Sequence, residues 1–204
     1  PTYENMNGVT MRSPLGIVAG SGMLPLALVK KCEQMGLSVV VVALNGSARA
    51  EDFAPHLRTS LPIGRGKSIV RFFQDNGVQN VVMIGAVRRP SFWELRPDFW
   101  TLIRIGPLLL RGGLGDDGLL RAVRKILERE GLRVQGIQTY LPDLVAAVGP
   151  MAHGTPDEDA HYDITRGFAV ARLLGMADVG QAVVVQGGMV LGVEAIEGTS
   201  ALIK

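Results

Sequence analysis

The chain has almost no cysteine and no long apolar run. Cys32 is its single cysteine among 204 residues, which excludes a disulfide framework and a thiolate zinc site. No apolar stretch approaches the ~20 residues needed to cross a bilayer, and no secretory signal precedes the first apolar run. We therefore expect a soluble, cytoplasmic protein.

An excess of charge of either sign is also missing. The 21 Lys and Arg residues nearly balance the 19 Asp and Glu residues, which argues against a dedicated nucleic-acid binder although the pI is about 9.0. Residues 88–125 are an exception, with eight basic residues against four acidic ones. This stretch is suited to meeting an anion. The chain is 47% hydrophobic with only 11 prolines, so it is long and apolar enough to bury a core.

Apolar patterns alternate between strand and helix along the first part of the chain. Runs at 15–19, 37–44, 59–63 and 78–84 predict buried strands, and helical spacing predicts helices at 24–35, 67–76 and from Asp116 to Gly131. This alternation predicts an α/β fold, a Rossmann-like and mostly parallel sheet. Ligands are then expected beyond the carboxyl ends of the strands.

The composition changes after this part. We expect a disordered leader at 1–13, a Rossmann-like N-terminal domain at 14–138, a linker at 139–163 rich in proline and acidic residues, and the start of a C-terminal α/β domain at 164–204. The last segment predicts a helix from about Ile164 and a hairpin around Gly187-Gly188. A helix and a hairpin bury too little surface alone, so we expect this domain to be incomplete or completed by another chain.

Three segments at expected carboxyl ends of strands carry candidate phosphate ligands. Gly20-Ser21-Gly22 permits close approach of a backbone to a ligand at a helix start, or is a tight turn alone. Lys67 opens the next helix, as a phosphate contact or an ordinary solvated residue. Gly85 is followed by Arg88 and Arg89, which suit bidentate phosphate capture or a surface turn.

Carboxylates and apolar residues suggest two further roles. Asp116 and Asp117 are either Mg²⁺ ligands or a helix cap. The aromatic and apolar stretch at 92–110 either packs in the core or contacts acyl chains and the membrane interface. The His and Asp residues at 153–163 match no standard metal spacing, and no nucleophile motif is present.

Several segments together resemble one family, the UDP-2,3-diacylglucosamine pyrophosphatases of the LpxI type from Gram-negative bacteria. The matching segments run in the same order along residues 14–204. They are Leu15-Gly-Ile-Val-Ala-Gly-Ser-Gly-Met-Leu-Pro25, Gly66-Lys67, Gly85 with Arg89-Pro90, Gly115-Asp-Asp-Gly-Leu-Leu120, Asp178-Val-Gly-Gln181 and Glu194-Ala-Ile-Glu-Gly-Thr199.

The resemblance implies Mg²⁺-dependent hydrolysis of the pyrophosphate of UDP-2,3-diacylglucosamine to UMP and 2,3-diacylglucosamine 1-phosphate, in lipid A synthesis. It implies a UDP-linked diacylated glucosamine lipid as the substrate, held between two domains. We also expect a homodimer, peripheral contact with the inner membrane, and no nucleic-acid partner. The expected metal ligands are Asp116 and Asp117, and the expected substrate-binding residues are Gly20, Ser21, Gly22, Lys67, Gly85, Arg89, Asp116, Asp117, Gln181 and Thr199.

The sequence departs from the family pattern at three positions. The family usually has Asn at Ala86, Lys at Leu114 and Asp at Ser200, and its essential carboxylate is expected beyond Lys204. The chain therefore resembles a truncated member whose own activity is open. A non-catalytic nucleotide or lipid-phosphate binding module is the alternative. A dinucleotide-dependent oxidoreductase is disfavoured because the third glycine of its motif is absent.

Overall fold

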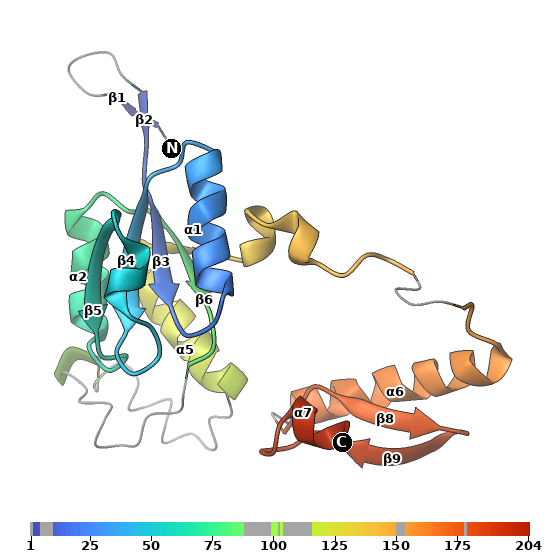
Figure 1. Cartoon of the computed structure of the whole chain (residues 1–204). Helices are drawn as coiled ribbons and strands as arrows, with labels where there is room; N and C mark the ends of the chain where they lie inside the picture. The colour runs from blue at the N-terminus through green and yellow to red at the C-terminus, as the bar shows by residue number, and fades with distance from the viewer. Residues whose placement is uncertain are drawn as a thin grey trace. The chain divides into compact units, whose positions relative to one another are not determined.

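The computed structural model describes residues 2–4, 10–87, 99–101, 103, 116–149, 154–177 and 179–204. The chain divides into two compact units (Figure 1). Unit 1 comprises Pro1–Arg111 and Ala122–Val145, and unit 2 comprises Gly112–Arg121 and Ala146–Lys204.

A five-stranded parallel sheet forms the centre of unit 1. Its strand order is β5-β4-β3-β6-β7. This is the Rossmann-like order: β3 lies in the centre, β4 and β5 extend the sheet on one side of it, and β6 and β7 extend the sheet on the other side. The predicted Rossmann-like α/β fold is confirmed. The strands are β3 (Leu15–Ala19), β4 (Val39–Leu44), β5 (Leu57–Leu61), β6 (Asn80–Ile84) and β7 (Arg133–Gln135).

The predicted helices of this unit are present within one or two residues of their expected ends. They are α1 (Leu24–Gln34), α2 (Gly66–Asp75) and α5 (Asp116–Arg129), and a short 3-10 helix η1 covers Ala50–Phe53. Gly36 and Gly77 follow α1 and α2 with positive φ, a conformation that ends helices and favours glycine. Two more 3-10 turns, η2 (Ile137–Thr139) and η3 (Pro142–Leu144), follow β7.

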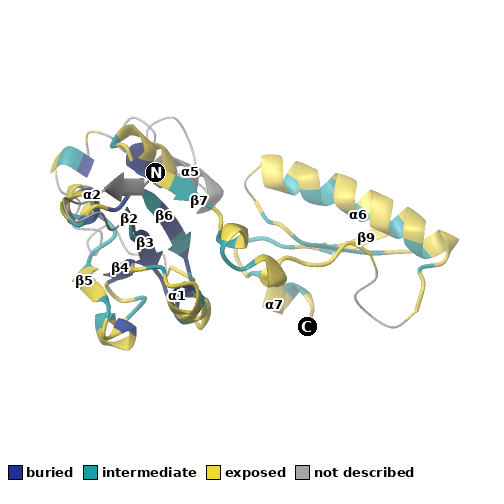
Figure 2. Cartoon of the chain, turned by 90° about the horizontal axis from the view of Figure 1, so that it is seen from above, coloured by how far each residue is buried: buried dark blue, intermediate teal, exposed yellow. Residues whose placement is uncertain are grey.

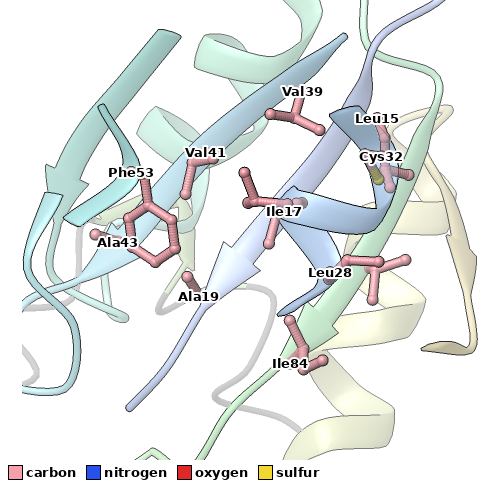
Figure 3. Packing of buried hydrophobic residues seen from close by; sticks show 12 residues of the cluster. Leu15, Ile17, Ala19, Leu28, Cys32, Val39, Val41, Ala43, Phe53 and Ile84 are labelled. Carbon is pink, nitrogen blue, oxygen red and sulfur yellow. The ribbon is translucent and has the colours of Figure 1, made fainter. Parts of the chain in front are cut away.

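Side chains alternate along β3 between two separate cores. Leu15, Ile17 and Ala19 pack with Leu28 and Cys32 of α1 on one face of the sheet (Figure 3). Burial of Cys32 raises the pKa of its thiol to about 11, so this thiol stays protonated and unreactive at neutral pH. The lone cysteine is therefore a packing residue.

The opposite face of the sheet is covered by α2 and α5. Val18 packs there with Phe73 of α2 and Leu127 of α5. Gly16 allows this close packing, because a Cβ at this position would lie 3.1 Å from the Phe73 ring. The central strands β3, β4 and β6 are largely buried between the two faces, as Figure 2 shows by their dark colour, whereas the edge strands β5 and β7 are exposed or half-buried.

The segment expected to be a disordered leader contains two short strands instead. Strand β1 (Thr2–Glu4) pairs antiparallel with β2 (Thr10–Arg12), from Thr2 opposite Arg12 to Glu4 opposite Thr10. A backbone ladder satisfies peptide groups whatever the side-chain polarity. The prediction of disorder relies on the polar composition of this segment, and composition does not show whether its backbone forms a ladder.

From residue 146 on, unit 2 consists of one long helix, a hairpin and a terminal turn of helix, and the first residues of α5 also belong to this unit. The long helix, the two hairpin strands and the terminal turn are α6 (Glu158–Met176), β8 (Val183–Gln186), β9 (Met189–Val193) and α7 (Thr199–Leu202). The predicted hairpin is confirmed, with φ values of 55° and 74° at Gly187 and Gly188 that fit a primed turn.

Helix α6 begins earlier than the sequence predicts. It starts at Glu158 rather than near Ile164, because the Asp157 side chain accepts a hydrogen bond from the Ala160 N–H at 2.8 Å and caps the helix. Asp157, Glu158 and Asp159, which are expected in the linker at 139–163, are therefore the cap and first turn of α6. They complement the positive end of its dipole.

The hairpin is attached to α6 through its turn. The Asp163 carboxylate accepts hydrogen bonds from the N–H groups of Gly187 at 2.9 Å and Gly188 at 2.6 Å. Asp163 thus has a structural partner on the hairpin. In the ranges that the structure covers, no helix is long and apolar enough to cross a membrane.

The two units differ in how well they are packed. None of the described residues of unit 2 is fully buried, whereas unit 1 has a core on each face of its sheet. Figure 2 shows the same contrast, since α6 is exposed or half-buried along its length. Unit 2 therefore relies on hydrogen bonds that solvent can reach.

We predict that hydrogen exchange will separate the two units. Amides of β3, β4 and β6 should exchange slowest, and those of β8 and β9 several orders of magnitude faster, because few buried apolar contacts protect the hairpin. Exchange followed by mass spectrometry measures both in one experiment. Equal protection of β4 and β9 would contradict this packing difference.

Candidate active site

The centre of the sheet has a topological switch point between β3 and β6. The chain after β3 enters α1 on one face, and α5, which precedes β7, packs on the opposite face. Open parallel sheets bind ligands where neighbouring strands diverge in this way. The predicted loops Gly20-Ser21-Gly22 and Gly85-Ala86 both lie at this point.

The two loops are bonded to each other. The Ser21 N–H and the Ser21 hydroxyl both donate to the Ala86 carbonyl oxygen, at 2.8 Å and 2.9 Å, and the Ala86 N–H donates to the Ser21 carbonyl at 3.0 Å. The Gly20 N–H donates to the Ile84 carbonyl at 2.8 Å. The loops thus continue the pairing of β3 and β6 beyond the strands.

Glycine is required on both sides of this contact. A Cβ at Gly20 would lie 2.5 Å from the Ala86 carbonyl oxygen, and one at Gly85 would lie 2.7 Å from the Gly20 carbonyl carbon. Gly85 also has a φ of 97°. The glycines were predicted to let the backbone approach a ligand closely. The close approach is present, but the Gly20 backbone approaches the Gly85-Ala86 loop of the same chain.

This pairing changes which groups remain for a ligand. Both hydrogen-bond donors of Ser21 are occupied, so Ser21 can offer a ligand only the lone pairs of its exposed hydroxyl. Gly22 and the first residues of α1 follow, and the first N–H groups of a helix have no partner within it. Pro25 supplies no N–H there.

Lys67 lies in the first turn of α2 with an exposed side chain. Beside it, the Gly66 N–H donates to the hydroxyl oxygen of Thr101 at 3.1 Å, and Thr101 is itself buried. Thr101 thus takes the place of a side-chain cap, which Arg65 does not provide. Thr101 is not among the predicted site residues, because no local sequence pattern links positions 66 and 101.

Three predicted ligands are not described at the level of their side chains. Arg89 lies outside the described residues. Asp116 and Asp117 open α5, as predicted, but their side chains fall outside the described part.

Gln181 and Thr199 are brought together in unit 2 by a residue that was not predicted as a site residue. The Glu194 carboxylate accepts the Gln181 N–H at 3.0 Å and the Thr199 hydroxyl at 2.6 Å. The hydrogen bond from Thr199, and then that from Gln181, lower the pKa of Glu194. Only the segment match at 194–199 pointed to Glu194, and it did not specify this contact.

Within the described ranges, no group of three His, Cys, Asp or Glu side chains could hold a metal ion. The carboxylate oxygens of Asp116 and Asp117 have the hard donor chemistry that Mg²⁺ prefers. They remain the candidates for this ion.

A parallel sheet in this strand order, with paired glycine loops at its switch point, defines a Rossmann-like α/β protein, a class that binds ligands at the carboxyl edge of its sheet. The chain matches the LpxI N-terminal domain over residues 14–144 and the LpxI C-terminal domain over residues 147–204. A relative, the UDP-2,3-diacylglucosamine pyrophosphatase LpxI of Caulobacter vibrioides, is 34% identical over 191 residues, which cover 93% of this chain and 68% of the relative. The chain belongs to the LpxI family.

Solved structures share only a distant similarity. The gox2253 protein is 14% identical, with 82% of this chain and 49% of that chain covered at a TM-score of 0.40. The Bordetella bronchiseptica enzyme WbmG in complex with NAD is 17% identical, with 60% and 36% covered at a TM-score of 0.38. At these TM-scores the similarity supports no conclusion about ligand or activity.

We predict that Gly20→Ala will destabilise the protein by about 1–3 kcal/mol, because the added methyl group meets backbone atoms that cannot turn away. Urea unfolding measures the cost. The amides of Ser21 and Ala86 should also exchange faster with solvent. Gly22→Ala is the matched control, since that position has open space and only its positive φ is strained. Unchanged protection of both amides in Gly20→Ala would rule out the close contact.

We predict that Thr199→Val will raise the pKa of Glu194 toward its ordinary value, because the carboxylate loses a hydrogen bond to its charged form. Carbon-13 NMR of the glutamate carboxyl group over a pH titration measures this. A carboxyl with a lowered folded-state pKa stabilises the fold above its unfolded pKa, and that stability is lost as the pH falls through the folded pKa.

The variant should therefore weaken the acid dependence of stability that Glu194 contributes. Ser200→Ala, at the exposed neighbouring hydroxyl, is the control and should leave the titration unchanged. An identical Glu194 titration in wild type and Thr199→Val would show that the hydroxyl does not bind the carboxylate in solution.

Proposed function

We propose that this protein hydrolyses the pyrophosphate bond of UDP-2,3-diacylglucosamine, giving UMP and 2,3-diacylglucosamine 1-phosphate in lipid A biosynthesis. The observation that carries the proposal is the 34% identity to a UDP-2,3-diacylglucosamine pyrophosphatase across both units. The paired glycine loops at the switch point support it, since a nucleotide diphosphate fits the carboxyl edge of such a sheet.

The proposed reaction is attack by water on one phosphorus atom. The water oxygen forms the new P–O bond, the bridging P–O bond breaks, and the water protons pass to solvent or to the released phosphates. Charge on the departing phosphate must be balanced during this step. In the proposal, Lys67 and Arg89 supply cationic contacts, and N–H groups at Gly22 and the start of α1 donate to phosphate oxygens.

Mg²⁺ dependence is part of the same proposal. When bound, the ion would supply charge neutralisation at the phosphates, and Asp116 and Asp117 are the residues that would hold it. Gln181 and Thr199, ordered by Glu194, would contact the substrate from unit 2.

The cellular setting is also a proposal. We place the protein in the cytoplasm, at the inner membrane where a diacylated substrate resides, and we propose a homodimer. The exposed apolar side chains of unit 2, among them Phe168, Leu173 and Met189, support an association of chains.

We predict that the full-length protein with Mg²⁺ releases UMP from UDP-2,3-diacylglucosamine and that EDTA stops this release. Asp116→Asn and Asp117→Asn should each lower kcat by about 100-fold or more. Each variant loses a carboxylate ligand of the proposed Mg²⁺, which would otherwise balance the charge on the phosphates. Quantification of UMP by chromatography measures both effects. Asp143→Asn, at an exposed acid of η3, is the control and should retain activity.

The absence of UMP release at any Mg²⁺ concentration would sink the hydrolase proposal. A non-catalytic binding module is the second candidate, favoured by the departures from the family pattern at Ala86, Leu114 and Ser200. Tight binding of the substrate by calorimetry without turnover would select it.

A further inference from the structure

Large apolar side chains are exposed together at the carboxyl edge of the sheet in unit 1. Met23 and Phe99 are the most exposed, each at 77%. We call the following set the apolar edge: Met23, Leu24, Val87, Phe99 and Ile103. The other large exposed apolar residues described in unit 1 are dispersed: Met35, Leu57, Leu144 and Val145.

The fold places these residues at one end of the sheet. Met23 and Leu24 follow β3 and Val87 follows β6, and the pairing of Ser21 with Ala86 holds these two loops side by side. The hydrogen bond from Gly66 to Thr101 attaches the segment of Phe99 to the start of α2, which follows β5. Because the strands are parallel, all three chain segments leave the sheet at the same end (Figure 1).

The helical turn at residues 99–101 and 103 is itself amphipathic. Thr101 is buried and Trp100 packs against the core formed by α2 and α5. Phe99 and Ile103 are spaced four residues apart, hence on one face of a helix, and both are exposed. The Phe99 end of the apolar edge is therefore held in place by its buried neighbours Trp100 and Thr101.

Two helix starts and two exposed cations lie at the same end of unit 1. Neither α1 nor α2 has an acidic residue in its first turn, so neither helix offsets the positive end of its own dipole. Arg65 and Lys67 are exposed beside them. An apolar patch next to positive charge complements an anionic bilayer, whose headgroups are negative and whose interior is apolar.

We propose that the apolar edge of unit 1 docks on the surface of an anionic phospholipid bilayer. Met23 and Phe99 enter the boundary between headgroups and acyl chains, and Arg65 contacts the headgroups. The choice of a bilayer over a protein partner rests on the proposed function, since a substrate with two acyl chains resides in the membrane. Docking by this edge brings the candidate phosphate ligands to the membrane surface, where the substrate headgroup lies.

Co-sedimentation with vesicles tests this proposal without any enzymatic readout. The full-length protein should bind vesicles of phosphatidylcholine with phosphatidylglycerol, bind pure phosphatidylcholine vesicles more weakly, and dissociate as salt is raised. Met23→Glu and Phe99→Glu should each lower the partition coefficient roughly tenfold or more, because an apolar contact becomes a like-charged one. Arg65→Ala should weaken binding to the anionic vesicles alone.

Met35→Glu is the matched control. Met35 is also an exposed methionine, 48% exposed, but it lies at the opposite end of α1 from Met23. This variant should bind vesicles like the wild type. Circular dichroism of each variant separates lost binding from lost folding.

Three results would overturn the proposal: no vesicle binding by the wild type, equal loss in Met35→Glu and Met23→Glu, or unchanged binding in Met23→Glu and Phe99→Glu. Vesicle binding without UMP release would leave docking in place and remove the hydrolase proposal, so the two failures are distinguishable.

Discussion

The candidate site depends on one contact, the approach of the Gly20 backbone to the backbone of Gly85 and Ala86. Atoms of the two loops lie where a Cβ on either glycine would be, which leaves no room for a side chain on either side. The contact joins the ends of β3 and β6 at the switch point of the sheet. This contact therefore fixes where the chain leaves β3 and where it leaves β6.

This contact gives the glycine turn a different role from the one its composition suggests. A Gly-Ser-Gly turn before a helix is typical of phosphate binding, yet here both donors of Ser21 are used to hold a neighbouring loop. Phosphate recognition then passes to Gly22, to the start of α1 and to cationic side chains. The turn organises the site, and its neighbours offer the ligand contacts.

The sequence was sufficient where the structure is determined by local patterns. Strand β3, helix α1 and the hairpin at Gly187-Gly188 follow from apolar periodicity and glycine position, and they lie where predicted. Strand β7 has only three residues and was missed, because its strand character comes from pairing with β6 and not from its own pattern.

The rest of the site depends on contacts between distant residues. Thr101 accepts from Gly66 and Glu194 joins Gln181 to Thr199, and no spacing rule predicts either contact. Asp157 was read as part of a linker because acidic residues beside proline resemble a loop, whereas its carboxylate caps α6. The polar, acidic character of this segment is visible in the sequence, but the sequence does not show that one of its carboxylates caps a helix.

The two units position their polar groups by different means, and this sets how each responds to change. In unit 1 the loops Gly20-Ser21-Gly22 and Gly85-Ala86 follow central strands that have a packed core on each face, so packing fixes the backbone positions of these loops. In unit 2 no described residue is fully buried, and Gln181 and Thr199 are held by one carboxylate that is open to solvent. A single exposed hydrogen-bonded carboxylate is far weaker than a packed sheet. The geometry of the unit 2 residues is therefore the part of the site most easily altered by pH or by a bound ligand.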